Sequence, residues 1–191
     1  MVVGLYRERT GLRRGRCKTL AEFPLYTPSS TTSPKTYSRS EIIGPERTLY
    51  LFDTFAGFDE RDVTGIDAQA NRSSFQDTSL EAVREFVGTT HIVYVPGFFP
   101  ESANTVTLPS RIALAHIDCD LYEPMKAALD LFYPRMAAGG VMILHDYASD
   151  HWPGATKAID EFFADKTESV VVLPDKAGTA IARIAKNRVV P

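Results

Sequence analysis

Four side chains in two short stretches of the sequence are typical metal ligands and proton acceptors. Asp118 and Asp120 lie two positions apart, and His145 and Asp146 are adjacent. Carboxylate oxygens suit Mg²⁺, whereas an imidazole shifts the preference toward Mn²⁺, Fe²⁺ or Zn²⁺. We predict that Asp118, His145 and Asp146 hold a divalent ion and that Asp120 is a general base. The alternative is that one or two of these acids only cap loops or helix N-termini.

Two neighbouring strands of a parallel sheet are needed to bring these pairs together. Each pair directly follows a short apolar run, Arg111–Ile117 in the first case and Val141–Leu144 in the second. Adjacent strands lie about 5 Å apart. In open parallel sheets, ligands bind beyond the carboxyl ends of the strands. The spacing therefore predicts that both pairs lie on one rim of the sheet.

Two further apolar runs end in residues suited to a nucleoside. Thr48–Phe52 is followed by Asp53, whose carboxylate can accept hydrogen bonds from ribose hydroxyls. His91–Val95 is followed, after one proline, by Gly97 and Phe98. A glycine lets a flat ring approach the backbone, and an aromatic side chain can stack on that ring. These residues are expected on the same rim.

The order of predicted elements indicates the fold class. Helices are expected at 77–87, from Pro124 to the pair Gly139-Gly140, and at 154–163, while 169–173 and 179–184 form a hairpin. Strands that alternate with helices are typical of a parallel sheet covered on both faces. We predict an α/β, doubly wound, mostly parallel sheet with a C-terminal antiparallel hairpin.

Composition excludes several classes of protein. The chain has 191 residues and a net charge of −3, which favours one domain and argues against nucleic-acid binding. No run of 18 apolar residues occurs, so no membrane span is expected. Two cysteines, Cys17 and Cys119, cannot form a disulfide framework, so a cytoplasmic location is expected. Cys119 is expected to be a small buried apolar residue.

Charge divides the chain into two parts. Residues 1–47 hold nine Lys or Arg and four acids, whereas the remainder is acidic. Residues 24–40 are rich in Pro, Ser and Thr and predict a loop or a disordered segment. The basic cluster at 13–18 is either a solvated arm or a binding site for anions. We therefore predict an atypical basic segment, 1–47, and a catalytic domain, 48–191.

Several stretches resemble the macrocin O-methyltransferase family. Its members are S-adenosylmethionine- and Mg²⁺-dependent enzymes that methylate sugar hydroxyls of antibiotics. The similarity spans about residues 48–185, and its most specific part is a D-x-D-x-Y pattern with a downstream D-Y. The resembling stretches are LYLFDTFAGF (49–58), FQDTSLEAVREFV (75–87), IVYVPGFFPES (92–102), residues 111–147 and GATKAIDEFF (154–163). The resemblance implies a Rossmann-like class I methyltransferase fold with a seven-stranded sheet.

The resemblance also assigns roles to individual residues. It makes Asp118 a metal ligand that also borders the cofactor, and it makes Asp120 the base that deprotonates the acceptor hydroxyl. His145 and Asp146 take the places of a paired Asp-Asp, so His145 departs from the family pattern and leaves the metal open. Asp53 would hold the cofactor ribose.

The resemblance assigns the adenine and the methionine half of the cofactor to other residues. Gly97 and Phe98 would border the adenine. In the family, a glycine-rich turn resembling E-x-G-V-Y-x-G-G-S wraps the methionine half, and here its nearest match is residues 2–10, with Gly4 retained. Glu8 and Arg9 replace later glycines, and bulky side chains obstruct close backbone approach. We therefore hypothesise that residues 1–47 are a degenerate or shortened cofactor-binding half.

These features predict an O-methyltransferase that acts on a hydroxyl of a sugar or small polar metabolite. S-adenosylmethionine and Mg²⁺, or another divalent metal, are the expected cofactors. The acceptor is expected to be a small molecule such as a glycoside, and a homo-oligomer is plausible. Two alternatives remain, namely an inactive or binding-only form of the fold, and a metal-dependent hydrolase that uses the same acids.

Overall fold

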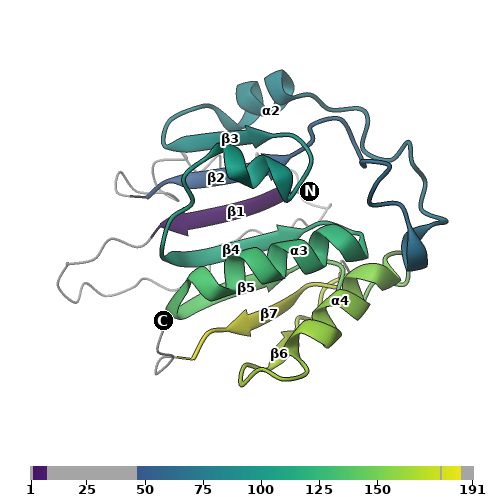
Figure 1. Ribbon diagram of the computed structural model, residues 1–191, viewed down its shortest axis with the longest axis vertical. Coiled ribbons are helices and arrows are strands. Elements are labelled where there is room, and N and C mark those ends of the chain that lie inside the picture. The colour runs from purple at the N-terminus through teal and green to yellow at the C-terminus, as the bar shows by residue number, and fades with distance from the viewer. Residues whose placement is uncertain (1, 8–46, 177, 186–191) are drawn as a thin grey trace, which may run out of the picture.

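A seven-stranded mixed β-sheet forms the centre of the computed structural model, which describes residues 2–7, 47–176 and 178–185 (Figure 1). The strand order is β3-β2-β1-β4-β5-β7-β6. The strands are β1 (Val2–Arg7), β2 (Leu49–Asp53), β3 (Ile92–Pro96), β4 (Ile112–Asp118), β5 (Met136–Leu144), β6 (Val170–Val172) and β7 (Ala180–Arg183). The predicted α/β class is confirmed. The predicted loop 24–40 and basic cluster 13–18 lie outside the described residues.

Strand direction sets where each strand end lies. β2 pairs with β3, and β4 with β5, in parallel. β7 pairs antiparallel with both β5 and β6, which confirms the C-terminal hairpin. Because β2, β3, β4 and β5 all point the same way, their carboxyl ends share one rim, as their sequences predicted.

β1 is inserted at the centre of the sheet in the opposite direction. It pairs antiparallel with both β2 and β4, with Val2 opposite Asp118 and Gly4 opposite His116. Gly4 therefore lies inside a strand and not in a turn at the rim. Arg7, the last residue of β1, pairs with Ile112 at the start of β4, so β1 ends at the rim away from Asp118 (Figure 1). Residues 2–7 belong to the sheet although they precede the predicted domain boundary at residue 47.

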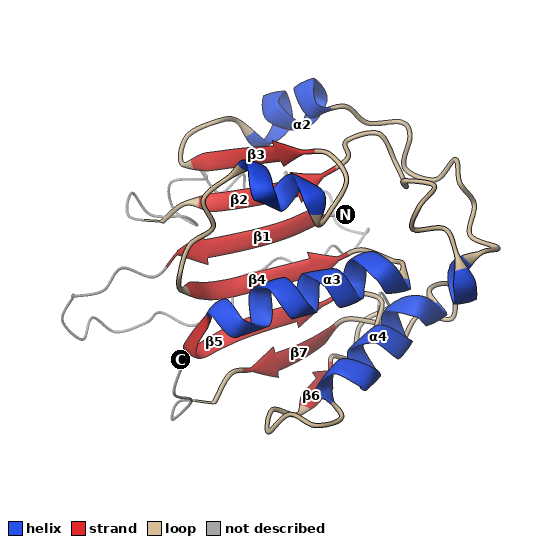
Figure 2. Cartoon of the chain, viewed as in Figure 1, coloured by secondary structure: helices blue, strands red, loops and turns tan. Residues whose placement is uncertain are grey.

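Helices cover the two faces of the sheet unequally. α3 (Tyr122–Phe132) and α4 (Pro153–Phe163) lie side by side on one face (Figure 2). On β2, Leu49 and Leu51 point to the opposite face, where they pack against Val87 of α2 (Leu80–Val87). Successive strand side chains alternate between faces, so α2 and α3 enclose separate apolar clusters. No helix in the described part of the chain is long and apolar enough to cross a membrane.

The core beneath α3 matches the apolar positions expected from the sequence. Met125, Leu129 and Phe132 are fully buried and share one cluster with Ile117 of β4. Complete burial of such a side chain contributes roughly 1.5–3 kcal/mol relative to exposure. Cys119 belongs to the same cluster, which confirms that it is a buried apolar residue. This packing places the residues that follow β4 on a rigid support.

The glycine pair 139–140 does not separate the helical segment from the next strand. That prediction was wrong, because β5 begins earlier, at Met136, and runs through both glycines. A Cβ on Gly140 would lie 2.9 Å from the Ala137 oxygen and 3.1 Å from the Ala113 oxygen. The pairing of β4 with β5 shifts register at this point. The glycines thus permit a bulge between closely packed backbones, and they do not end the segment.

A buried carboxylate joins the hairpin to the short 3₁₀ helix η3 (Tyr133–Arg135). Glu168 accepts a hydrogen bond from the Tyr133 hydroxyl at 2.7 Å and one from the Ala185 N–H at 3.1 Å. Burial opposes its ionisation, but these hydrogen bonds outweigh burial and hold the pKa of Glu168 below its ordinary value. The ionised form therefore stabilises the fold at neutral pH, and this contribution disappears as pH falls through the lowered pKa.

The exchange of Tyr133 for Phe tests this contribution. A hydrogen bond to a charged group contributes about 1.5–3 kcal/mol, so Tyr133→Phe is expected to lower the free energy of unfolding by roughly that amount at pH 7. The difference from the unmodified chain should shrink below about pH 4.3, where the carboxyl is protonated in the unfolded chain and begins to protonate in the folded one. Urea unfolding at several pH values measures both quantities. A difference that stays constant over this pH range would contradict the assigned role of Glu168.

Candidate functional site

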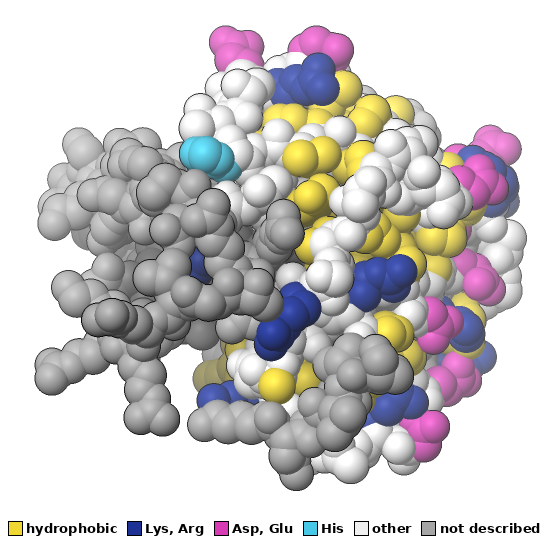
Figure 3. Space-filling view, turned by 60° about the vertical axis from the view of Figure 1, so that its left-hand side comes forward, with side chains coloured by type: hydrophobic (Ala, Val, Ile, Leu, Met, Phe, Trp, Pro, Cys, Tyr) yellow, Lys and Arg dark blue, Asp and Glu magenta, His cyan; other side chains and the backbone are white. Residues whose placement is uncertain are grey.

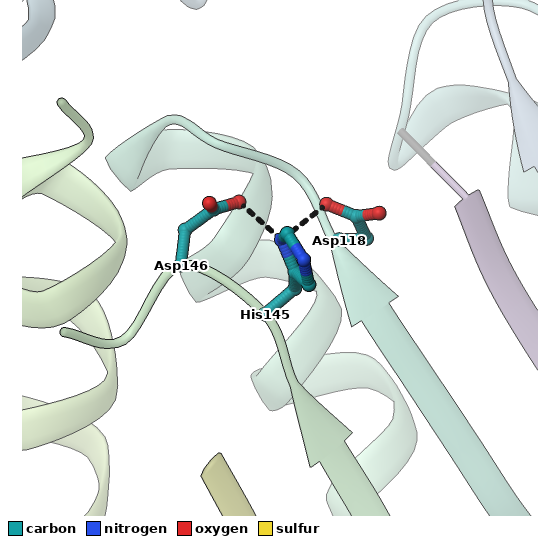
Figure 4. A group of neighbouring side chains, drawn as sticks. All are labelled: Asp118, His145 and Asp146. Atoms are coloured by element: carbon teal, nitrogen blue, oxygen red, sulfur yellow. Dashed lines mark hydrogen bonds and ion pairs between the residues drawn. The ribbon is translucent and has the colours of Figure 1, made fainter. Parts of the chain in front are cut away.

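The four predicted metal and base residues meet at the carboxyl ends of β4 and β5. The Nδ1 atom of His145 lies 3.2 Å from Oδ1 of Asp118 and 2.8 Å from Oδ2 of Asp146 (Figure 4). The His145 N–H donates to the Ile117 carbonyl at 2.9 Å, which extends the strand pairing to the edge of the site. Asp118 is the last residue of β4. The sheet thus brings Asp118 next to His145 and Asp146, which lie 27 and 28 positions later in the chain.

Sharp backbone turns follow both strand ends. Asp120 and Asp146 have φ values of 60° and 61°, a region that residues other than glycine seldom adopt. Asp tolerates it better than most, but such conformations still cost of order 1–3 kcal/mol and cluster at functional sites. Both carboxylic residues are buried, at 8% and 5% exposure. The rest of the fold therefore holds two strained, buried acids at this rim.

The electrostatics of the cluster follow from its geometry. Hydrogen bonds to Asp118 and then to Asp146 raise the pKa of His145 to about 10, so the imidazole carries a proton at neutral pH. Burial, followed by the charges of Asp146 and Asp118, raises the pKa of Asp120 to about 7. The imidazolium therefore partly neutralises a group of three neighbouring carboxylic acids. Such a group attracts a further cation.

The donor set fits a divalent metal ion. One ligand atom each from Asp118, His145 and Asp146 lie within 4.8 Å of one another. Adjacent ligands of an octahedral ion with bonds of about 2.1 Å lie about 3 Å apart, close to the two separations observed here. The imidazole must lose its proton before it can bind a metal, so protons and metal ions compete for His145. These three residues are the ones that would hold the ion.

A pocket of about 560 Å³ opens beside this cluster. Its polar wall consists of Asp53, Asp118, Asp120, His145 and Asp146, all predicted as site residues. The other walls are almost entirely apolar. They consist of Leu49, Leu51, Phe52, Phe55, Gly57, Phe58, Phe75, Thr78, Val83, Val87 and Trp152. Figure 3 turns the left-hand side of Figure 1 forward, away from this pocket, and there too apolar side chains are exposed over part of the surface.

The residues predicted to bind a nucleoside are not all in this pocket. Asp53 lines it, and its Oδ1 accepts a hydrogen bond from the Phe55 N–H at 2.6 Å. Gly97 lines a separate and much narrower pocket. The ring of Phe98 is covered by the guanidinium of Arg61, whose Cζ lies 3.5 Å from the ring centre. Asp53 therefore lines the pocket of the acids, whereas Gly97, whose N–H donates to the Asp53 carbonyl at 3.0 Å, lines the smaller pocket.

Asp67 is a site-supporting residue that the sequence did not reveal. It lies in the 3₁₀ helix η1 (Gly65–Asp67), it is 4% exposed, and it accepts a hydrogen bond from the Tyr122 N–H at 2.7 Å. A Cβ on Gly154 would lie 2.6 Å from its carboxyl carbon. The carboxylate thus contacts the first turns of both α3 and α4, where helix dipoles favour negative charge. No local pattern in the polar stretch 59–77 marks this residue.

Three aromatic residues also escaped the sequence prediction. Phe58, Phe75 and Trp152 contact one another, with ring centres 5.3 to 6.4 Å apart. Phe58 and Phe75 lie in the connection between β2 and α2, on either side of η1, and Trp152 directly precedes α4. All three line the same pocket as the acids. No pattern in the sequence of these segments predicts that their aromatic rings contact one another.

Comparison with known proteins identifies one family. A model of the family described as macrocin O-methyltransferase (TylF) matches residues 40–175. Two curated relatives are mycinamicin III 3''-O-methyltransferase of Micromonospora griseorubida, 27% identical over 129 residues, and demethyldecarbamoylnovobiocin O-methyltransferase of Streptomyces niveus, 28% identical over 132 residues. These matches cover 61% and 62% of this chain. They cover 49% and 48% of the relatives, so the chain spans about half of their length.

Solved structures show the same fold. The O-methyltransferase NovP is 25% identical, has a TM-score of 0.63, and the match covers 72% of this chain and 60% of that one. The calicheamicin methyltransferase CalS11 is 26% identical, has a TM-score of 0.55, and the match covers 75% of this chain and 64% of that one. These neighbours confirm the class I methyltransferase fold predicted from the sequence.

Proposed function

The chain belongs to the macrocin O-methyltransferase family, and on that premise we propose that it methylates a hydroxyl group of a small glycoside. The proposed methyl donor is S-adenosylmethionine, and the proposed second cofactor is a divalent metal ion. The observation that carries the proposal is the cluster of Asp118, His145 and Asp146, which lies beside Asp120 in one pocket. The relatives' names describe methylation of an antibiotic or its sugar, which supports a glycoside acceptor.

Each acidic residue has a proposed task. When bound, the metal lowers the pKa of the acceptor hydroxyl and S-adenosylmethionine provides an electrophilic methyl group. Asp118, His145 and Asp146 would bind the ion and thereby position the hydroxyl. Asp120 would accept the hydroxyl proton on one of its carboxylate oxygens. The remaining task of the chain is to orient the two substrates and to exclude water.

Asp53 and the direction of β1 bear on how the chain would bind the methyl donor. Asp53 lines the pocket and is the proposed partner of the ribose hydroxyls. Because β1 runs antiparallel to β4, Arg7 pairs with Ile112, so the strand that would lead into a glycine-rich turn ends at the rim away from Asp118. This observation favours a second candidate function, in which the chain binds metal and acceptor without transferring a methyl group.

A titration decides between the two functions. We expect S-adenosylmethionine to bind the full chain with a micromolar dissociation constant, and more tightly with Mg²⁺ or Mn²⁺ present. Isothermal calorimetry with and without each ion measures this directly. Absence of binding under all conditions would contradict the methyltransferase proposal and support the binding-only function. Release of phosphate or carboxylate from ester substrates without a methyl donor would instead indicate a hydrolase.

A further inference from the structure

The three contacting rings of Phe58, Phe75 and Trp152, here termed the aromatic cluster, line the pocket. Phe58 lies 5.3 Å from Phe75 and 5.5 Å from Trp152, both in edge-to-face geometry. The third pair, Phe75 and Trp152, is tilted at 6.4 Å. Phe58 and Phe75 come from the connection between β2 and α2, and Trp152 comes from the segment between β5 and α4. The cluster is therefore assembled only in the folded chain.

Two rings of the aromatic cluster lie outside the buried core. Phe75 is 52% exposed, and its φ of 61° is unfavourable for an aromatic residue. Neither Phe58 nor Phe75 belongs to either apolar cluster of the sheet. Trp152 is partly buried and packs against the larger of these clusters. Apolar side chains that stay partly exposed around a pocket, one of them on a strained backbone, are typical of a ligand site.

Two close contacts hold the loops of the cluster together. Gly57 has a φ of 89°, and a Cβ there would lie 2.6 Å from the Ser74 oxygen and 2.9 Å from Cγ of Gln76. Only glycine therefore lets the backbone before Phe58 approach the loop that carries Phe75. The contact of Asp67 with Gly154 secures the start of α4, directly after Trp152. These two close contacts therefore hold in place the segments that carry the three rings.

The pocket combines two kinds of lining. Asp118, Asp120, His145 and Asp146 contribute to its polar wall, and the aromatic cluster forms part of its apolar wall. A hydroxyl buried against those rings without a hydrogen bond would cost roughly 1–3 kcal/mol. An apolar or aromatic ring in the same place loses no hydrogen bond and gains favourable edge and face contacts with the cluster. The occupant that fits both kinds of lining is a molecule with a polar sugar and an apolar ring.

We propose that the aromatic cluster binds the apolar aglycone of the glycoside acceptor while a sugar hydroxyl faces Asp120. This inference rests on the proposed function and narrows its substrate class, because it disfavours a bare sugar or a small polar metabolite. The flat adenine of the methyl donor is the competing occupant, and the test below separates the two.

The only tryptophan of the chain is Trp152, so its fluorescence reports directly on the cluster. The full chain is titrated with phenyl β-glucoside and with methyl β-glucoside, which share the sugar and differ in the aglycone. We expect the phenyl compound to bind about tenfold more tightly and to change the Trp152 emission. Phe75→Ala should remove this preference and leave the affinity for methyl β-glucoside unchanged.

Phe86→Ala is the matched control, because Phe86 is 90% exposed on α2 and does not line the pocket. It should preserve the preference for the phenyl compound. Equal affinities of the two glucosides for the unmodified chain would overturn the proposal. So would a Phe75→Ala variant that binds S-adenosylhomocysteine about tenfold more weakly yet keeps the preference for phenyl β-glucoside, since adenine would then be the occupant.

The proposed function can fail without this inference failing. The glucoside titrations need neither methyl donor nor turnover. If S-adenosylmethionine does not bind but the phenyl preference is present and depends on Phe75, the aglycone site stands and the methyltransferase proposal falls. If S-adenosylmethionine binds and the phenyl preference is absent, the aglycone site falls and the methyltransferase proposal stands.

Discussion

Exchange of Asp120 for Asn is expected to lower the rate of methyl transfer by about 10²- to 10⁴-fold, the usual contribution of a general base. An amide cannot accept the hydroxyl proton. Asn has nearly the same shape as Asp and also tolerates the φ of 60° at this position, so the fold should persist. Single-turnover assays with a glycoside acceptor measure the rate. Calorimetry should show that the affinity for S-adenosylmethionine is unchanged.

Asp130→Asn is the matched control for this prediction. Asp130 lies on α3 and pairs with Lys126 at 2.8 Å in an exposed salt bridge, away from the pocket. Loss of this salt bridge should change the rate of methyl transfer and the free energy of unfolding only slightly, because exposed ion pairs contribute little to stability. A fully active Asp120→Asn variant would show that another group takes the proton.

A second large effect is expected from His145→Asp, which changes the donor set from one nitrogen and two oxygens to three oxygens. Imidazole favours Mn²⁺, Fe²⁺ and Zn²⁺, whereas carboxylates favour Mg²⁺. We therefore expect the affinity for Zn²⁺ to fall about ten- to hundredfold and the affinity for Mg²⁺ to rise. Calorimetric titration of each metal chloride measures this change without any turnover.

Stability gives a second readout of the same exchange. The variant loses the ion pairs of His145 with Asp118 and Asp146 and gathers three acids in their place. It should melt at a lower temperature without metal and regain stability when Mg²⁺ is added. His151→Asp, in an exposed loop outside the pocket, is the control and should alter neither metal preference nor melting. Unchanged metal preference in His145→Asp would remove His145 from the proposed ligand set.

Local patterns were sufficient for most of the elements. The run before Asp118 and the run before His145 are apolar and short, which limits them to buried strands. The spacing of Met125, Leu129 and Phe132 suits one face of a helix, and all three are buried. The acids after the strands could be grouped because parallel strands share a carboxyl rim.

Features that depend on contacts between distant segments were not predictable. The first strand has the composition of a strand, but nothing local specifies that it runs antiparallel between β2 and β4. Asp67 is one acid among many in a polar loop until Tyr122 donates its N–H to it. The glycine pair at 139–140 resembles a helix end, and only its close packing against Ala113 reveals a bulge.

Local sequence patterns were enough to identify the family, the class of sheet, and the acids and the histidine that meet at its rim. These properties follow from short-range periodicity and from residue chemistry, and both can be recognised in the sequence without the structure. The tertiary structure alone decided that Gly4 lies within a reversed central strand, that Phe98 lies beneath Arg61, and that Phe58, Phe75 and Trp152 form one surface. Strand direction and loop contacts depend on the free energy gained when whole segments bury apolar surface against each other. That gain exists only in the assembled fold.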